Sequence, residues 1–236
     1  MRPSVESLFT SFEYGNLSLA NRFVMSPMTR NFSPDGVPGD NVASYYTRRA
    51  TAKTGLIITE GIGVNHPSAI GHSTMGEENI PVLHGEAALA GWRKVVDDVH
   101  SAGGKIIPQL WHMGGARLEG IPPHPETKSM RPDDMSEDEI AEIIAAFVSS
   151  AANAKATGFD GVALHGGHGY LIDAFLWKQT NRRDDAWGGD IKRRTRFASE
   201  LVKAIRAEVG PDFPILFRLS QWKMQDYEAK LAETPD

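Results

Sequence analysis

The chain has 236 residues, 41% hydrophobic and 23% charged, a composition typical of a globular protein with one large domain or two small ones. Its formal net charge of −5 offers no basic surface, so nucleic acid and anionic membranes are not expected partners. It contains no cysteine for a disulfide or a zinc site, no signal peptide and no apolar run of the ~18 residues that span a membrane, so a cytoplasmic protein is expected.

In chain order, residues 8–20 have the pattern of a β-hairpin, and after them short apolar runs alternate with longer amphipathic stretches. The runs are continuously apolar, which is typical of strands covered on both faces in a parallel sheet. Helices are predicted from periodic apolar residues and from end signals such as the capping box at Ser136. The predicted strands are 22–26, 55–59, 105–110, 159–164 and 214–219; the predicted helices are 41–52, 86–100, 136–158 and a fourth that carries Phe197, Leu201 and Ile205 and ends at Gly210.

This alternation fits either a doubly wound sheet or a barrel. No glycine fingerprint for a dinucleotide follows the first strand, and reactive residue types follow the ends of several strands, which favours the (β/α)8 TIM-barrel type. At about 45 residues per β-α unit, eight units need roughly 360 residues. We therefore expect only about the first five units, with Thr234-Pro235-Asp236 beginning the next helix in a C-terminally truncated barrel.

The most informative segment runs from Phe159 to Tyr170, where a buried strand leads into His165 and His168, with glycines between them. Imidazoles can donate hydrogen bonds to a developing oxyanion, and the phenol of Tyr170 can supply a proton. The alternatives are a metal-binding histidine pair or histidines satisfied within a loop. Because the cluster lies at a strand end of a predicted barrel, we predict that it is catalytic.

Three further strand ends carry polar groups. Gln109 ends the third strand, and its buried amide needs partners, either a polar heterocycle or neighbouring backbone. The segment Ser26-Pro-Met-Thr29 presents a hydroxyl after the first strand. Arg218 lies in an apolar strand, so it needs an anion or acceptors, or else an ion pair with a carboxylate such as Glu60. The tryptophans are expected in core or loop packing rather than against a cofactor.

Several segments of the sequence, taken together and in their order along the chain, resemble the Old Yellow Enzyme family of FMN-dependent ene-reductases. The resemblance covers essentially the whole chain. The matching segments are Asn21 to Arg30, Gly55 to Glu60, Gln109-Leu-Trp-His112, His165 to Leu176, and Asn181-Arg182 with Asp185, Trp187-Gly-Gly189 and Arg194.

The resemblance implies a single FMN-binding TIM-barrel domain over residues 1–236, with the hairpin covering the barrel floor. It also implies reduction of the activated C=C bond of an α,β-unsaturated carbonyl compound, with NADH or NADPH as reductant. His165 and His168 would bind the carbonyl oxygen of the enone, and Tyr170 would protonate the α-carbon. The residues implied to bind FMN are Ser26, Pro27, Met28, Thr29, Gly61, Gln109 and Arg218, the last two at the pyrimidine edge; no metal is expected.

The chain departs from the family pattern at Met113-Gly-Gly-Ala-Arg117, which is longer than usual, and at Ala163, where a glutamate is usual and would pair with Arg218. A five-stranded barrel would also leave an open edge that invites association, including with a second copy. Two alternatives remain open at this point. One is a catalytically impaired barrel fragment that does not hold FMN by itself, and the other is a metal-dependent hydrolase that uses His112, His165 and His168.

Overall fold

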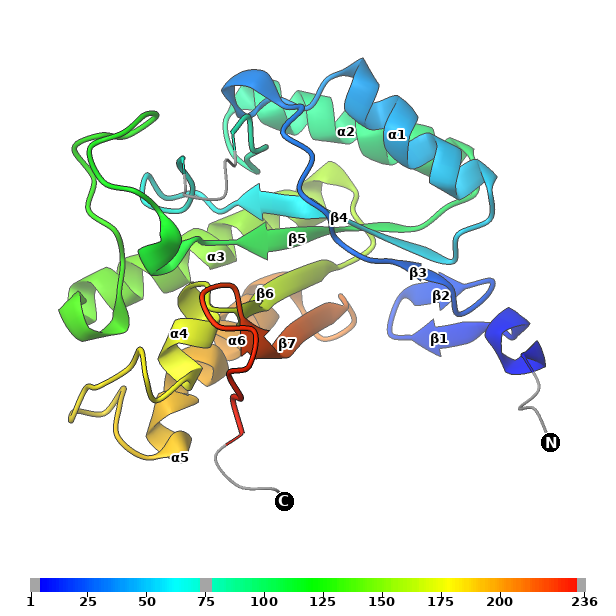
Figure 1. Ribbon diagram of the computed structural model, residues 1–236. Helices are drawn as coiled ribbons and strands as arrows, with labels where there is room; N and C mark the ends of the chain where they lie inside the picture. The colour runs from blue at the N-terminus through cyan, green and yellow to red at the C-terminus, as the bar shows by residue number, and fades with distance from the viewer. Residues whose placement is uncertain (1–4, 73–77, 233–236) are drawn as a thin grey trace.

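The computed structural model describes residues 5–72 and 78–232. Its centre is a curved parallel sheet of five strands, which lie side by side in chain order (Figure 1). The strands are β3 (Val24–Met25), β4 (Leu56–Gly63), β5 (Ile106–Trp111), β6 (Val162–His168) and β7 (Ile215–Lys223). This order is that of successive β-α units in a barrel, so the predicted partial (β/α) barrel is confirmed.

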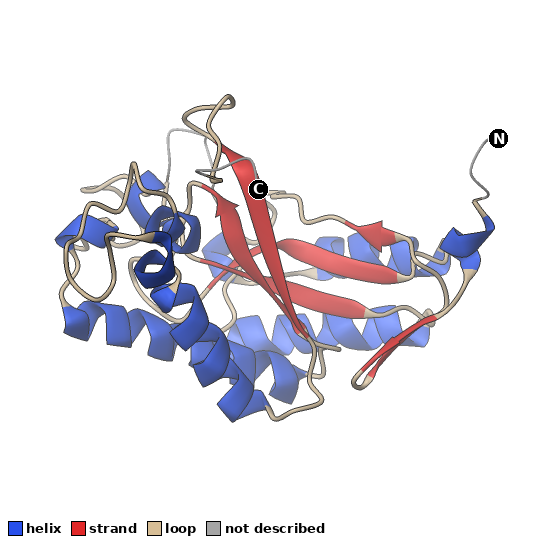
Figure 2. Cartoon of the chain, turned by 90° about the horizontal axis from the view of Figure 1, so that it is seen from below, coloured by secondary structure: helices blue, strands red, loops and turns tan. Residues whose placement is uncertain are grey.

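The long helices lie together on one side of the sheet (Figure 2). They are α1 (Asp40–Thr51), α2 (Glu86–Ser101), α3 (Glu137–Thr157) and α6 (Arg196–Val209). The predicted capping box begins α3: the Glu139 N–H donates to Ser136 Oγ at 3.1 Å, and the Ser136 N–H donates to Glu139 Oε2 at 2.8 Å. The shorter helices are α4 (Leu171–Leu176) and α5 (Ile191–Arg194), and the 3-10 turns are η1 (Glu6–Phe9), η2 (Pro34–Gly36), η3 (Gly114–Ala116) and η4 (Pro132–Asp134).

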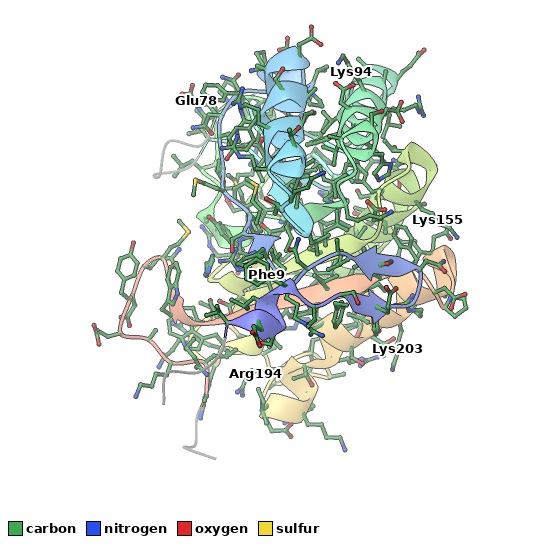
Figure 3. All side chains as sticks on the ribbon, turned by 90° about the vertical axis from the view of Figure 1, so that its right-hand side faces the viewer. Phe9, Glu78, Lys94, Lys155, Arg194 and Lys203 are labelled. Atoms are coloured by element: carbon green, nitrogen blue, oxygen red, sulfur yellow. The ribbon has the colours of Figure 1, made fainter. Side chains whose placement is uncertain are left out.

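The predicted hairpin forms from β1 (Phe12–Tyr14) and β2 (Leu17–Leu19), which pair antiparallel. Figure 3 looks from the hairpin side, where the hairpin lies in front of the sheet beside Phe9. Two leucines of β2, Leu17 and Leu19, are buried in one cluster with Leu56, Ile107 and Ala163, which come from three strands. The hairpin therefore closes one end of the sheet, the end at which the strands begin.

Strand β4 contains an irregularity that matters for the site. Its register against β5 shifts between Ile58 and Gly61, so that Gly61 pairs with Gln109. Thr59 lies within the shift and is fully buried; its Oγ1 accepts the Gln109 N–H at 3.2 Å and donates to the Glu60 carbonyl at 2.8 Å. A bulge of this kind re-aims the side chains that follow it. Here it sets Gly61 and Gln109 side by side at the ends of their strands.

Both outer strands of the sheet keep exposed apolar side chains. Val24 of β3 is 48% exposed, and Leu219 of β7 is 58% exposed. The two strands pair with β4 and β6 respectively, each along one side. The expected helix start at residues 234–236 lies outside the described residues. Within the part of the chain that the structure describes, none of the helices is both long and apolar enough to cross a membrane.

Candidate active site

The carboxyl ends of the strands surround a cleft of about 140 Å³. Nine of the ten predicted site residues line it, and Ser26 does not. The tenth lining residue is Trp111, which sequence reasoning had assigned to packing. It lies two positions after Gln109 in β5, and residues two apart in a strand point to the same face. The lining residues are Pro27, Met28, Thr29, Gly61, Gln109, Trp111, His165, His168, Tyr170 and Arg218.

Three aromatic side chains from the end of β6 and the turn after it meet in the cleft. The His165 ring lies 5.0 Å from the His168 ring and 4.8 Å from the Tyr170 ring, and both contacts are edge-to-face. Burial, reinforced by His168 and Arg218, lowers the pKa of His165 to about 3. Burial, with Arg218 and Lys223, lowers the pKa of His168 to about 4. Both imidazoles are therefore neutral near pH 7, and each offers one N–H donor.

The end of β6, which carries both histidines, is held by contacts between its backbone and β7. The His168 N–H donates to Ser220 Oγ at 2.7 Å, and His168 adopts a left-handed conformation with φ of 67°. A Cβ on Gly167 would lie 2.8 Å from Ser220 Oγ, so glycine is required for this approach. Backbone strain of this kind is characteristic of functional sites. Here the left-handed conformation of His168 presents its side chain to the cleft.

Several donors around the cleft lack partners among the described residues. They are buried and comprise Gln109 Nε2, Trp111 Nε1 and His165 Nδ1. Arg218 is half-buried and forms no ion pair with any described carboxylate. Ala163 packs in the cluster that holds Leu17 and Leu19 and supplies no charge. Buried donors without partners are rare, so this set is suited to a ligand rich in acceptors.

Glu60 does not pair with Arg218, contrary to one of the sequence alternatives. It is buried beside Arg30, whose backbone N–H donates to Glu60 Oε2 at 3.0 Å and whose Nη1 lies 3.9 Å from Oε1. The Arg30 guanidinium also lies over the Tyr45 ring at 3.6 Å. Burial outweighs these contacts and raises the pKa of Glu60 to about 7. Arg30 and Glu60 thus join the segment after β3 to β4.

His112 also lies outside the cleft. Its Nε2 lies 3.0 Å from Ser68 Oγ, and its Nδ1 accepts the Gly114 N–H at 3.0 Å. Burial lowers the pKa of His112 to about 3, so it is a neutral residue with both ring nitrogens engaged. Among the described residues, no three side chains of the His, Asp and Glu types are placed to hold a metal ion. His112, His165 and His168 therefore do not form the metal site of the hydrolase alternative.

Comparison with known proteins shows the family of the chain. The profile of the NADH:flavin oxidoreductase / NADH oxidase family matches residues 7–235. The chain belongs to this family. An NADH oxidase of Thermoanaerobacter brockii is 38% identical over 91% of the chain, and a probable inactive reductase of Epichloe festucae var. lolii is 37% identical over 93%. An Old Yellow Enzyme homologue from Zymomonas mobilis superposes with a TM-score of 0.84 at 30% identity, covering 94% of the chain.

The NADH:flavin oxidoreductase relatives are longer than this chain. It spans 34% and 60% of the length of the two relatives and 66% of the solved structure. The resemblance to the Old Yellow Enzyme family is confirmed, and with it FMN and NAD(P)H as the cofactor and reductant of the family. The residues present fit the polar ring of FMN, because Gln109 Nε2 is an unpartnered buried donor beside the Gly61 backbone. The roles of individual site residues stay predictions.

Proposed function

We propose that the chain carries the substrate-polarising part of an FMN-dependent ene-reductase, which reduces the C=C bond of an α,β-unsaturated carbonyl compound. The observation that carries the proposal is the pair of neutral, neighbouring imidazoles of His165 and His168 in a cleft with Tyr170. Two neutral N–H donors can bind one carbonyl oxygen and withdraw electron density from the conjugated alkene. Such a pair has no evident use in packing alone.

The residues of the cleft have different roles in the proposed reaction. His165 and His168 bind the carbonyl oxygen, so that the β-carbon becomes electron-poor. Tyr170, whose ring contacts both Trp111 and His165, donates the proton to the α-carbon. FMN, when bound, supplies the hydride chemistry, with NADH or NADPH as the source of electrons. Its pyrimidine edge would be held by Gln109 and by Arg218, with Pro27, Met28, Thr29 and Gly61 along the ring and Ser26 just outside the cleft.

The test begins with the purified protein and added FMN. We expect a perturbed flavin spectrum that titrates to saturation, followed by NADPH-dependent loss of cyclohexenone. Tyr170→Phe should keep the flavin spectrum and lower the turnover rate by about 10²- to 10⁴-fold, the usual contribution of a general acid. A protein that binds FMN but shows equal turnover for Tyr170→Phe would contradict the assigned proton donor.

The alternative is a chain that does not hold FMN by itself. One observation favours it: a relative of 37% identity is named a probable inactive reductase. In this case the protein would stay colourless with excess FMN, and no cyclohexenone would be consumed. The same titration therefore decides between the two proposals.

A further inference from the structure

His168 differs from the buried His112 in how its ring is held. Among the described residues, neither ring nitrogen of His168 has a hydrogen-bond partner, although its backbone N–H and carbonyl bond to Ser220 Oγ and the Met224 N–H. Both ring nitrogens of His112 are engaged. A ring whose nitrogens are kept for a ligand can be oriented only by contacts with its faces and edges.

Trp222 provides that contact. Its indole stacks on the His168 imidazole with centroids 4.2 Å apart and planes 20° from parallel. His165 meets the same imidazole at its edge, at 86°. Trp222 is 37% exposed and is not among the residues that line the cleft, so it lies behind His168. Tyr227 stacks on Trp222 at 5.4 Å and extends the row of rings outward.

The residue after Trp222 is anchored to the turn that carries His168. Lys223 and Asp173 form an ion pair in which both side chains are fully buried, with Lys223 Nζ 2.9 Å from both carboxylate oxygens. Asp173 Oδ2 also accepts the N–H of Gly169, the residue after His168, at 2.6 Å. The Asp173 carboxylate therefore binds both Lys223, which follows Trp222, and Gly169, which follows His168. Charge-assisted hydrogen bonds of this kind are short and hold their groups in a defined geometry.

We propose that Trp222 is a positioning residue for His168. Its stacked indole holds the imidazole so that both ring nitrogens stay available to the cleft, and the Lys223–Asp173 pair fixes the indole in register with the turn. The proposal rests on the proposed function, in which His168 binds the carbonyl oxygen. Because Trp222 does not line the cleft, its effect on ligands must pass through His168.

The first test needs no flavin. The ring protons of His168, assigned by their loss in His168→Gln, are recorded by NMR in the wild type, Trp222→Phe and Trp222→Leu. We expect ring-current shifts in the wild type, reduced shifts in Trp222→Phe, and their loss in Trp222→Leu. Trp222→Phe serves as the matched control, since it keeps an aromatic face. Identical His168 shifts in Trp222→Leu and the wild type would overturn the proposal.

The second test is a double-mutant cycle on the binding of phenol to the FMN-loaded protein. We expect Trp222→Leu to weaken phenol binding about tenfold and Trp222→Phe to restore most of it, as misorientation of a binding group costs affinity. In the His168→Gln background, Trp222→Leu should have no further effect. An equal, additive loss there would show that Trp222 acts independently of His168, and would overturn its positioning role. If the FMN-loaded wild type binds no phenol, the proposed function fails, and the NMR shifts alone decide whether Trp222 orients His168.

Discussion

His165 and His168 polarise a ligand by hydrogen bonding rather than by charge. Their depressed pKa values, about 3 and about 4, leave both imidazoles neutral across the physiological range. A neutral pair avoids the repulsion between two imidazolium ions that are in ring contact at 5.0 Å. It also keeps the nearby Arg218 as the cation of the cleft, where it can favour negative charge on a ligand.

The contribution of His165 can be measured directly. His165→Ala should weaken the binding of phenol to the FMN-loaded protein by about tenfold to a hundredfold, the worth of one hydrogen bond to a charged oxygen. A spectroscopic titration measures the dissociation constant. Tyr170→Phe is the control, since it leaves both imidazoles in place. Equal affinities for His165→Ala and the wild type would remove His165 from the oxygen-binding pair.

Glu60 gives the stability of the protein a pH dependence of known sign. Its pKa rises from 4.5 to about 7 on folding, so the folded state holds the proton more tightly. The stability it contributes is full below pH 4.5 and is lost as the pH rises through about 7. Glu60→Gln removes this pH-dependent contribution to the unfolding free energy. The difference in unfolding free energy between wild type and variant, from urea titrations, should therefore favour the wild type more at about pH 5 than at about pH 8; a constant difference contradicts the assignment.

At the scale of the strand, the bulge in β4 connects folding to the cleft. Thr59 Oγ1 accepts the backbone N–H of Gln109, and the same shift sets Gly61 beside Gln109. Trp111 then packs over Gly61, where a Cβ would lie 2.6 Å from Trp111 Cε3. One buried hydroxyl thus holds the backbone of Gln109, and the same bulge places Gly61 against Trp111.

Thr59→Val tests this link. The substitution keeps the shape but leaves the buried Gln109 N–H without its acceptor, so we expect a loss of about 1–3 kcal/mol in unfolding free energy. FMN affinity should fall as well, because Gln109 is released. Thr59→Ser keeps the hydroxyl and should retain the FMN affinity. Urea denaturation and flavin fluorescence measure the two effects; unchanged FMN affinity in Thr59→Val would separate the bulge from the site.

The sequence predicted that five strands exist and roughly where each begins, because apolar runs are local signals, but β4, β6 and β7 each extend four residues beyond the predicted ends. His165, Gln109 and Arg218 were found in this way. The bulge at Thr59 was not, since the register between two strands depends on contacts across the sheet. The alternative pairing of Arg218 with Glu60 does not form; Glu60 lies beside Arg30 instead, which the pairing of β3 with β4 brings close to it. Trp111 could have been found from its spacing to Gln109.

At the scale of the whole molecule, the two outer strands of the sheet carry exposed apolar side chains. Leu219 of β7 and Val24 of β3 are both substantially exposed, and an outer strand presents backbone groups that can pair with another chain. We propose that the protein self-associates through these strands.

Leu219→Lys should reduce this association, because a charged side chain on an outer strand opposes pairing. Sedimentation velocity over a concentration series should show a shift toward larger species in the wild type and a smaller shift in the variant. Far-UV circular dichroism, unchanged between the two, provides the control for folding. A wild type that sediments as a single small species at every concentration would contradict the proposal.

The hairpin of β1 and β2 contacts residues that lie about 200 positions later in the chain. The Asn16 N–H donates to the Asp212 carbonyl at 3.1 Å, and a Cβ on Gly15 would lie 2.5 Å from the same oxygen. During synthesis the hairpin leaves the ribosome well before β7, yet its packing is complete only when the segment before β7 has followed. We therefore expect docking of the hairpin to be a long-range step in folding, complete only when residues near Asp212 have been made.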